Sequence, residues 1–88
     1  MLTLSKSEII PALTAHYEQQ LRESTYRLFA FEEKYAMSFP AFEKHVQDAE
    51  EEDFDQWEDY ISWKGHRKAA HELSKRIKTI QDGLFELA

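Results

Sequence analysis

The stretch of sequence that decides the fold is Lys34-Tyr35-Ala36-Met37-Ser38-Phe39-Pro40-Ala41-Phe42-Glu43. Ser38 is a favourable N-cap, because its side-chain oxygen can accept a hydrogen bond from an unpaired amide of the first helical turn. Met37 and Phe42 then occupy the two positions of a hydrophobic staple. Pro40 falls in the first turn, where its missing N–H is tolerated. The stretch therefore predicts that one helix ends near Tyr35 and that another begins directly after Ser38.

A long helix is predicted before this stretch, over about residues 6–35. Its apolar residues recur at heptad-like spacing, which is typical of a helix that packs along one face: Ile10, Leu13, Tyr17, Leu21, Leu28, Phe31 and Tyr35. The small polar Ser24 is the one interruption of this seam. Ser5 and Glu8 match a capping box at the helix start. Pro11 is expected either to start the regular helix or to kink its early turns.

A short helix is predicted over about residues 39–47, packed against the end of the first helix. The apolar face of the first helix widens there beyond what two paired helices need, through Tyr26, Leu28, Phe29 and Phe31. The expected partners on the short helix are Phe39, Phe42 and Val46.

A second long helix is predicted over about residues 54–82, with Asp53 as its N-cap. Gly65 interrupts it at a cost of about 1 kcal/mol relative to Ala, so either the helix bends or another backbone approaches closely. Gly83 is a candidate C-cap, although apolar residues at Leu84 and Leu87 would also allow the helix to continue. Its later turns keep an apolar seam: Ala70, Leu73, Ile77, Ile80 and Leu84.

These patterns predict one all-α domain over residues 1–88, an antiparallel hairpin of two long helices joined by a short one. A lone hairpin leaves much of each apolar face in contact with water. Pairing of two copies into a four-helix-type bundle would bury that surface. We therefore expect a homodimer.

Composition and charge exclude several classes of function. The chain has no Cys, its N-terminus lacks the apolar core of a signal peptide, and no apolar run is long enough to cross a bilayer. These features predict a cytoplasmic protein that does not enter the membrane. The net charge of −6 disfavours binding to DNA and suits a basic partner.

The sequence contains no phosphate-binding loop, no nucleophile elbow and no pair of His at zinc-binding spacing, because His66 and His71 are five apart. We expect neither an enzyme nor a bound metal or cofactor.

The strongest candidate for a binding surface is an acidic run. Eight carboxylates occur in the twelve residues from Asp48 to Asp59. The run lacks the spacing and the central Gly of a calcium-binding EF-hand loop. A solvated loop that binds no partner is one alternative to a binding surface. Acidic residues also alternate with aromatic ones here, and aromatic anchors with steering charges are typical of protein interfaces. The predicted partner-binding residues are Glu51, Asp53, Phe54, Asp55, Trp57, Glu58, Tyr60 and Trp63.

A basic cluster follows in the same predicted helix: Lys64, Arg67, Lys68, Lys75, Arg76 and Lys78. Such residues can contact phosphates, and they can equally pair with the acidic run of the same chain or of a second copy. The spacing of Lys64, Arg67, Lys68, Lys75 and Lys78 places these residues on more than one helical face, which disfavours a single nucleic-acid-binding stripe.

Two segments of the chain also resemble a known group of proteins. They read Lys34-Tyr35-x-Met37-Ser38-Phe39-x-x-Phe42-Glu43 and Phe54-x-x-Trp57-Glu58-x-Tyr60-x-x-Trp63. Together, over about residues 28–80, they resemble small all-helical antitoxin-like proteins of prokaryotic toxin–antitoxin gene pairs, which carry a KYGMSFEEFE-like hinge. This chain departs from that hinge at Ala36, where Gly is usual, and at Pro40-Ala41, where an acidic pair is usual. Without the Gly, a left-handed turn residue costs more free energy at this position.

The resemblance implies a protein that binds and neutralises a cognate toxin, such as a ribonuclease, and it brings no catalytic residues. The predicted mechanism is masking of the toxin by the acidic and aromatic region. Two alternatives remain at this point. One is a self-associating structural protein without a toxin, and the other is a nucleic-acid-binding regulator that uses the basic cluster between Lys64 and Lys78.

Overall fold

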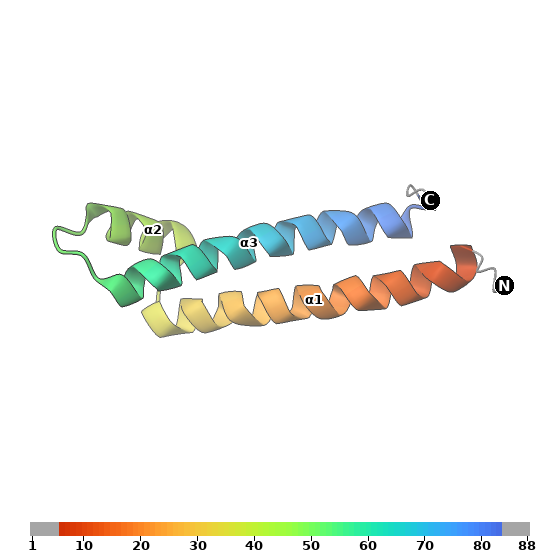
Figure 1. The fold of residues 1–88 in the computed structure, drawn as a ribbon, viewed down its shortest axis with the longest axis horizontal. Helices are drawn as coiled ribbons and strands as arrows, with labels where there is room; N and C mark the ends of the chain where they lie inside the picture. Colours follow the sequence, from red (N-terminus) through yellow and green to blue (C-terminus); the bar gives the residue numbers. More distant parts are fainter. Residues whose placement is uncertain (1–5, 84–88) are drawn as a thin grey trace.

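The computed structural model describes residues 6–83, which form three α-helices: α1 (Lys6–Tyr35), α2 (Phe39–Asp48) and α3 (Phe54–Gln81). α1 and α3 lie side by side and antiparallel, and the shorter α2 lies against α3 at the end of the hairpin where the chain turns back (Figure 1). The result is a rod of 61 × 22 × 20 Å. The prediction of an all-helical chain with a short helix between two long ones is confirmed. The described helix ends lie within one residue of their predicted positions.

The hinge between α1 and α2 has the predicted caps. Ser38 is the N-cap of α2, with an extended backbone (φ −73°, ψ 162°), and its hydroxyl accepts from the Ala41 amide at 3.5 Å. Met37, the first half of the staple, packs against the buried residues of the hinge, which include Phe42. Ala36, directly after the last residue of α1, has a positive φ of 53°. The position that usually carries Gly in the resembling hinge therefore does adopt the left-handed conformation, here with an alanine.

The hydrophobic core lies at the hinge end and is mostly aromatic. Phe42 is 0% exposed and Trp63 is 1% exposed, and both belong to a buried cluster with Phe39 and Tyr60. The Trp63 ring stacks on Phe42 with centroids 5.3 Å apart and on Phe31 at 5.5 Å. Phe39 meets Trp63 edge to face at 5.5 Å. Buried aromatic pairs at these distances contribute more than their buried area alone, so this cluster fixes α1, α2 and α3 relative to one another.

The prediction about the widened face of α1 is only partly right. Leu28 and Phe31 do pack on the cluster that contains the α2 residues. Tyr26 and Phe29 remain 69% and 57% exposed. Residues three apart share a helix face, whereas residues two apart point in nearly opposite directions. The face that carries Leu28 and Phe31 is therefore covered, and Tyr26 and Phe29 point away from α3.

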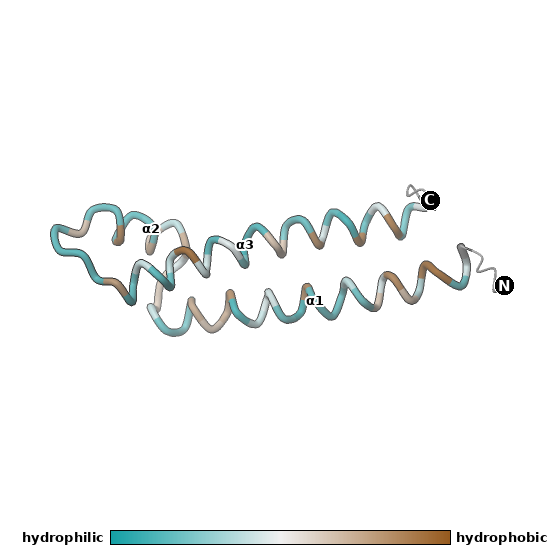
Figure 2. The backbone as a smooth tube through the Cα atoms, in the orientation of Figure 1, coloured by the Kyte–Doolittle hydropathy of each residue, from teal (hydrophilic) through white to brown (hydrophobic). Residues whose placement is uncertain are grey.

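Away from the hinge, a thinner seam holds α1 against α3. Figure 2 shows that the apolar residues of α3 lie on the side turned to α1. Ile77 and Ile80 are buried there, and the interrupting Ser24 of α1 is also buried, at 7% exposure. Pro11 lies inside α1 and does not start it.

At the end of α3 the C-cap residue is Asp82, and Gly83 follows it with a positive φ of 70° and an N–H that donates to the Ile80 carbonyl. Gly83 therefore ends the helix, one residue beyond the C-cap position itself. The capping-box residue Ser5 and the continuation through Leu84 and Leu87 lie outside the described residues.

Candidate functional site

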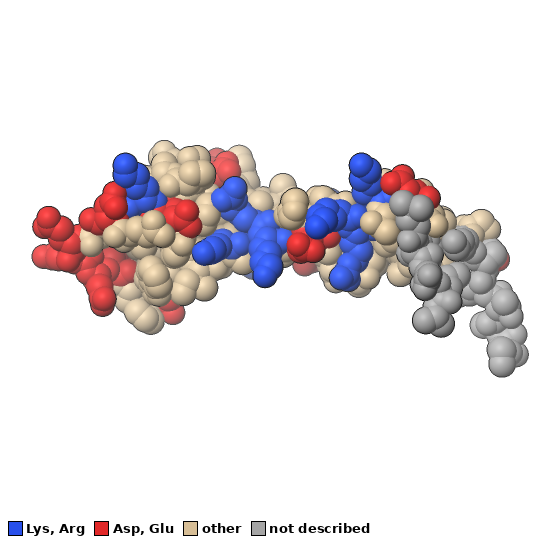
Figure 3. Space-filling model, turned by 90° about the horizontal axis from the view of Figure 1, so that it is seen from above, with Lys and Arg blue, Asp and Glu red and all other residues tan. Residues whose placement is uncertain are grey.

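The acidic run, residues 48–59, lies at the end of the rod where α2 passes into α3. Figure 3 shows its carboxylates gathered at this end. Seven of its eight acidic residues are exposed, and the eighth, Asp59, is half-buried. No Lys or Arg occurs within the run. Like charges at this density produce a strong negative potential, which attracts a basic partner and accelerates its association.

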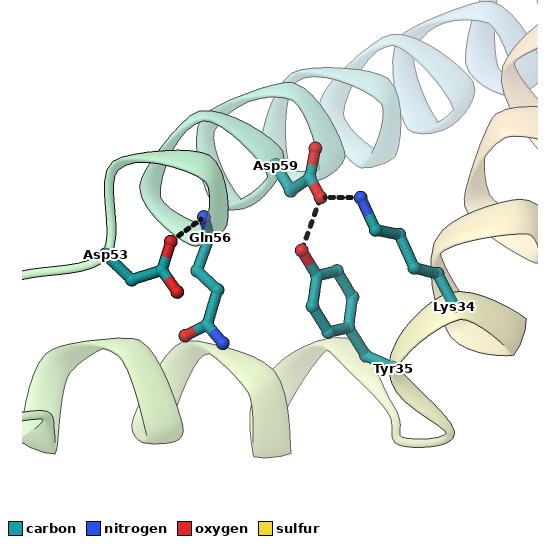
Figure 4. A network of polar contacts seen from close by, with 5 residues as sticks. All are labelled: Lys34, Tyr35, Asp53, Gln56 and Asp59. Atoms are coloured by element: carbon teal, nitrogen blue, oxygen red, sulfur yellow. Dashed lines mark hydrogen bonds and ion pairs between the residues drawn. The ribbon is translucent and has the colours of Figure 1, made fainter.

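Asp53 holds the start of α3 in place. Its carboxylate accepts a hydrogen bond from the Gln56 amide at 3.1 Å (Figure 4). Its backbone is extended (φ −113°, ψ 108°), as an N-cap requires. A negative charge at this position also interacts favourably with the helix dipole. Asp53 therefore has the predicted capping role, and it remains exposed at the same time.

The four aromatic residues predicted to bind a partner divide into two pairs. Phe54 and Trp57 are 71% and 47% exposed, as an interface anchor requires. Tyr60 and Trp63 are buried, so the prediction that they lie on the binding surface is wrong. The Tyr60 ring stacks on Phe39, and its hydroxyl donates to Glu43 Oε2 at 2.7 Å. Tyr60 and Trp63 therefore both belong to the hydrophobic core.

A third apolar side chain joins the exposed pair. Ile61 is 55% exposed and follows Trp57 by four residues, and Trp57 follows Phe54 by three. These positions share one side of a helix. Ile61 was absent from the predicted site, although this spacing would have identified it. The corrected candidate surface, called the acidic end below, consists of Glu51, Asp53, Phe54, Asp55, Trp57, Glu58 and Ile61.

Behind this surface, one polar contact ties the start of α3 to the end of α1. Lys34 Nζ lies 2.6 Å from Asp59 Oδ2, and the Tyr35 hydroxyl donates to the same oxygen (Figure 4). Partial burial by itself raises the pKa of the Asp59 carboxyl, but the hydrogen bonds from Lys34 and Tyr35 outweigh it and hold this pKa below its ordinary value. Burial, and then the hydrogen bond to Asp59, raise the pKa of the Tyr35 hydroxyl to about 12. The contact is structural and faces the hinge.

We expect the Asp59→Asn variant to lose about 1 kcal/mol of unfolding free energy at neutral pH, because Tyr35 and Lys34 lose a charged acceptor. A carboxyl whose pKa is lowered by folding stabilises the protein above its ordinary pKa of about 4, and that stabilisation disappears as the pH falls through the folded value. The difference in unfolding free energy between the variant and the wild type should therefore shrink below about pH 4. Urea unfolding over a pH series measures this difference. Glu58→Gln, an exposed neighbour, is the control, and a pH-independent difference for Asp59→Asn would contradict the assignment.

Four lysines of the basic cluster lie along one side of α3. Lys64, Lys68, Lys75 and Lys78 follow one another at separations of four, seven and three residues, and all four are exposed. These four lysines therefore share one side of α3, although the cluster as a whole lies on more than one face. Arg67 and Arg76 do turn elsewhere, over the rings of Phe39 (4.5 Å) and Tyr17 (5.5 Å) respectively. Figure 3 shows the basic groups along α3 on the side away from α1.

Within residues 6–83, no group of three or more His, Asp or Glu side chains is placed to hold a metal ion. None of the three helices, over the same residues, combines the length and the apolar character needed to cross a bilayer. Comparisons with protein-family models, with curated proteins and with solved structures found no match to the chain. The functional argument therefore rests on the surface itself.

Proposed function

We propose that the protein is an antitoxin-like binding protein that masks a basic cognate toxin, such as a ribonuclease, with its acidic end. The observation that carries the proposal is the position of Phe54 and Trp57, which are exposed in the middle of seven exposed carboxylates. A protein that needed these aromatics only for folding would bury them, as it buries Tyr60 and Trp63. The hinge and helix-start motifs that resemble antitoxin-like proteins support the same proposal.

The mechanism is steric and electrostatic. The carboxylates attract a basic surface over several ångströms and set the orientation of the encounter. Phe54 and Trp57 then supply the desolvated anchors on which most of the binding free energy depends. A basic groove that otherwise holds RNA would be filled by such a surface, since the acidic end presents negative charge as a phosphate backbone does. No catalytic step is required of this chain.

We also propose that the protein acts as a homodimer. The hairpin buries one side of α1 and one side of α3, and among residues 7–83 it leaves five large apolar side chains exposed: Tyr26, Phe29, Phe54, Trp57 and Ile61. Pairing of two copies would remove part of this surface from water.

Charge reversal tests the masking. A small basic protein encoded by a neighbouring gene would be the toxin candidate for this test. The triple variant Glu51→Lys, Asp55→Lys, Glu58→Lys should bind it at least about tenfold more weakly, because several close charge pairs become repulsive. Binding should also become less sensitive to salt, since salt screens mainly exposed charges. Titration calorimetry at low and high salt measures both effects.

The matched control carries the same change of net charge on α1, as Glu23→Lys, Glu32→Lys, Glu33→Lys. These residues are exposed and lie outside the acidic end. Equal weakening by both triple variants would show that only net charge matters, which contradicts a defined surface. Failure of the wild type to form a complex with the neighbouring gene product, judged by size-exclusion chromatography after co-expression, would overturn the antitoxin proposal.

A further inference from the structure

The side of α3 that is turned away from α1 carries a regular pattern over the whole helix. Eight residues follow one another at alternating spacings of three and four, and every one of them is exposed: Phe54, Trp57, Ile61, Lys64, Lys68, His71, Lys75 and Lys78. This alternation is the spacing by which one helix packs along another. We call these eight residues the outer stripe. It is apolar in its first three positions and basic in the other five.

The carboxylates that lie near the apolar end of the outer stripe cannot neutralise the lysines of its other end within one chain. Asp55 and Lys75 are twenty residues apart on a continuous helix, which corresponds to about 30 Å. That distance is several times the screening length of about 8 Å at physiological ionic strength. Lys68, Lys75 and Lys78 make no ion pair with any residue between 6 and 83. The rod shape thus separates the acidic end from the lysines of the outer stripe. A more compact fold would bring these two groups of charges together.

Gly65 is a second feature of this side of α3. It is exposed, and a Cβ atom added to it would meet nothing within 4 Å. Its φ is not positive, so neither backbone conformation nor packing within the chain requires glycine here. Glycine in a helix interior nevertheless costs about 1 kcal/mol relative to alanine. A glycine on a helix surface permits another backbone to approach closely.

We propose that the outer stripe is the self-association surface of the protein and that it pairs antiparallel with the outer stripe of a second copy, with the two helices crossing near Gly65. The inference rests on the proposed homodimer, and because this dimer covers Phe54 and Trp57, a toxin and a second copy would compete for the same two side chains. A two-fold axis at the crossing brings residue 54 of one copy beside residue 78 of the other, and residue 57 beside residue 75. A parallel pairing would instead place like charges together along the helix.

In the antiparallel arrangement, the apolar end of each outer stripe meets the basic end of the other, so the two-fold axis produces the same contact twice. Lys75 and Lys78 of one copy lie over Trp57 and Phe54 of the other, where cation–π contact is favourable, and near the carboxylate of Glu58, which follows Phe54 by four residues on the same edge of α3. Near the axis, Lys64 and Lys68 of both copies come together and repel. Lysines of the same stripe therefore have opposite effects: Lys75 and Lys78 strengthen the dimer, and Lys68 weakens it.

Sedimentation velocity of the full chain over a concentration series tests this surface. The wild type should dimerise, and more weakly as salt rises. Lys75→Glu with Lys78→Glu should raise the dissociation constant by at least about tenfold, and added Glu58→Lys should restore part of the loss. Lys68→Gln should lower the dissociation constant. Gly65→Ala should raise it, while raising the thermal midpoint measured at concentrations where the chain is monomeric. Arg22→Glu with Arg27→Glu, on α1, is the charge-matched control.

The remaining outcomes overturn the inference. A wild-type monomer at every concentration excludes both the dimer and its surface. A dimer that is insensitive to Lys75→Glu with Lys78→Glu places the self-association elsewhere, such as on Tyr26 and Phe29 of α1, and leaves the proposed homodimer intact. Retention of a DNA duplex that both Lys68→Gln and Lys75→Glu weaken, without dimerisation, assigns the outer stripe to phosphate binding instead. None of these measurements contains the toxin candidate, so their failure is distinguishable from failure of the masking proposal.

Discussion

Replacing Trp63 by alanine is expected to remove about 3–5 kcal/mol of unfolding free energy, because a fully buried tryptophan leaves both its transfer free energy and a cavity behind. Trp63 is 1% exposed and contacts rings from both other helices: Phe31 on α1, and Phe39 and Phe42 on α2. A chain of 88 residues has a total stability of about 4–13 kcal/mol. The variant should therefore be largely unfolded at moderate urea concentrations, as measured by circular dichroism.

The matched control is Trp57→Ala, which removes the same side chain six residues earlier in α3. Trp57 is 47% exposed, so its loss should cost much less stability while weakening the binding of a partner. Equal destabilisation by the two variants would contradict the division of the aromatic residues into core and surface. Because the Trp63 variant is expected to unfold, only the Trp57 variant informs on binding.

The Ala36→Gly variant is expected to be more stable than the wild type by about 1 kcal/mol. A left-handed residue with a Cβ atom costs about 1–2 kcal/mol, and glycine removes that cost in exchange for some conformational entropy. Ala36 has a φ of 53° and is exposed, so no packing is lost. In a domain of this size the gain corresponds to a rise of about 4–8 °C in the thermal midpoint, which differential scanning calorimetry resolves.

The opposite sign is expected for the same substitution inside a helix. Ala30 is exposed in α1, and Ala30→Gly should lower stability by about 1 kcal/mol, because glycine is a poor helix former. Destabilisation by both variants would show that the α1–α2 hinge does not hold Ala36 in the left-handed conformation.

The helix ends could be predicted from sequence because they are decided locally. Ser38 and Asp53 cap the helices that follow them through contacts within four residues, and such signals do not depend on the rest of the fold. Gly83 is decided in the same way at the other end of α3. The hairpin then follows from the apolar seams, since two long helices joined by a short connection can cover them only by packing side by side.

The division of the candidate site into surface and core could not be predicted in the same way. Aromatic residues occupy both sides of the first turns of α3, and the sequence pattern alone ranks neither side as the inner one. The position of α2 decides it: Phe39 and Phe42 cover the side that carries Tyr60 and Trp63, and Phe54 and Trp57 stay exposed. The regular outer stripe was obscured by Arg67 and Arg76, which interrupt its spacing but pack on aromatic rings.

The placement of the aromatic core at one end has a consequence for how the hairpin opens. At the hinge, four buried aromatic side chains help to join the three helices, whereas the opposite end is held, among residues 7–83, by Ile77, Ile80 and half-buried residues of α1. Local unfolding has a lower free energy where fewer apolar groups are buried. Separation of α1 from α3 should therefore start at the end remote from the hinge and stop at Trp63. The chain could thus accommodate a bound helix between its separated arms, or exchange an arm with a second copy, while the hinge stays folded.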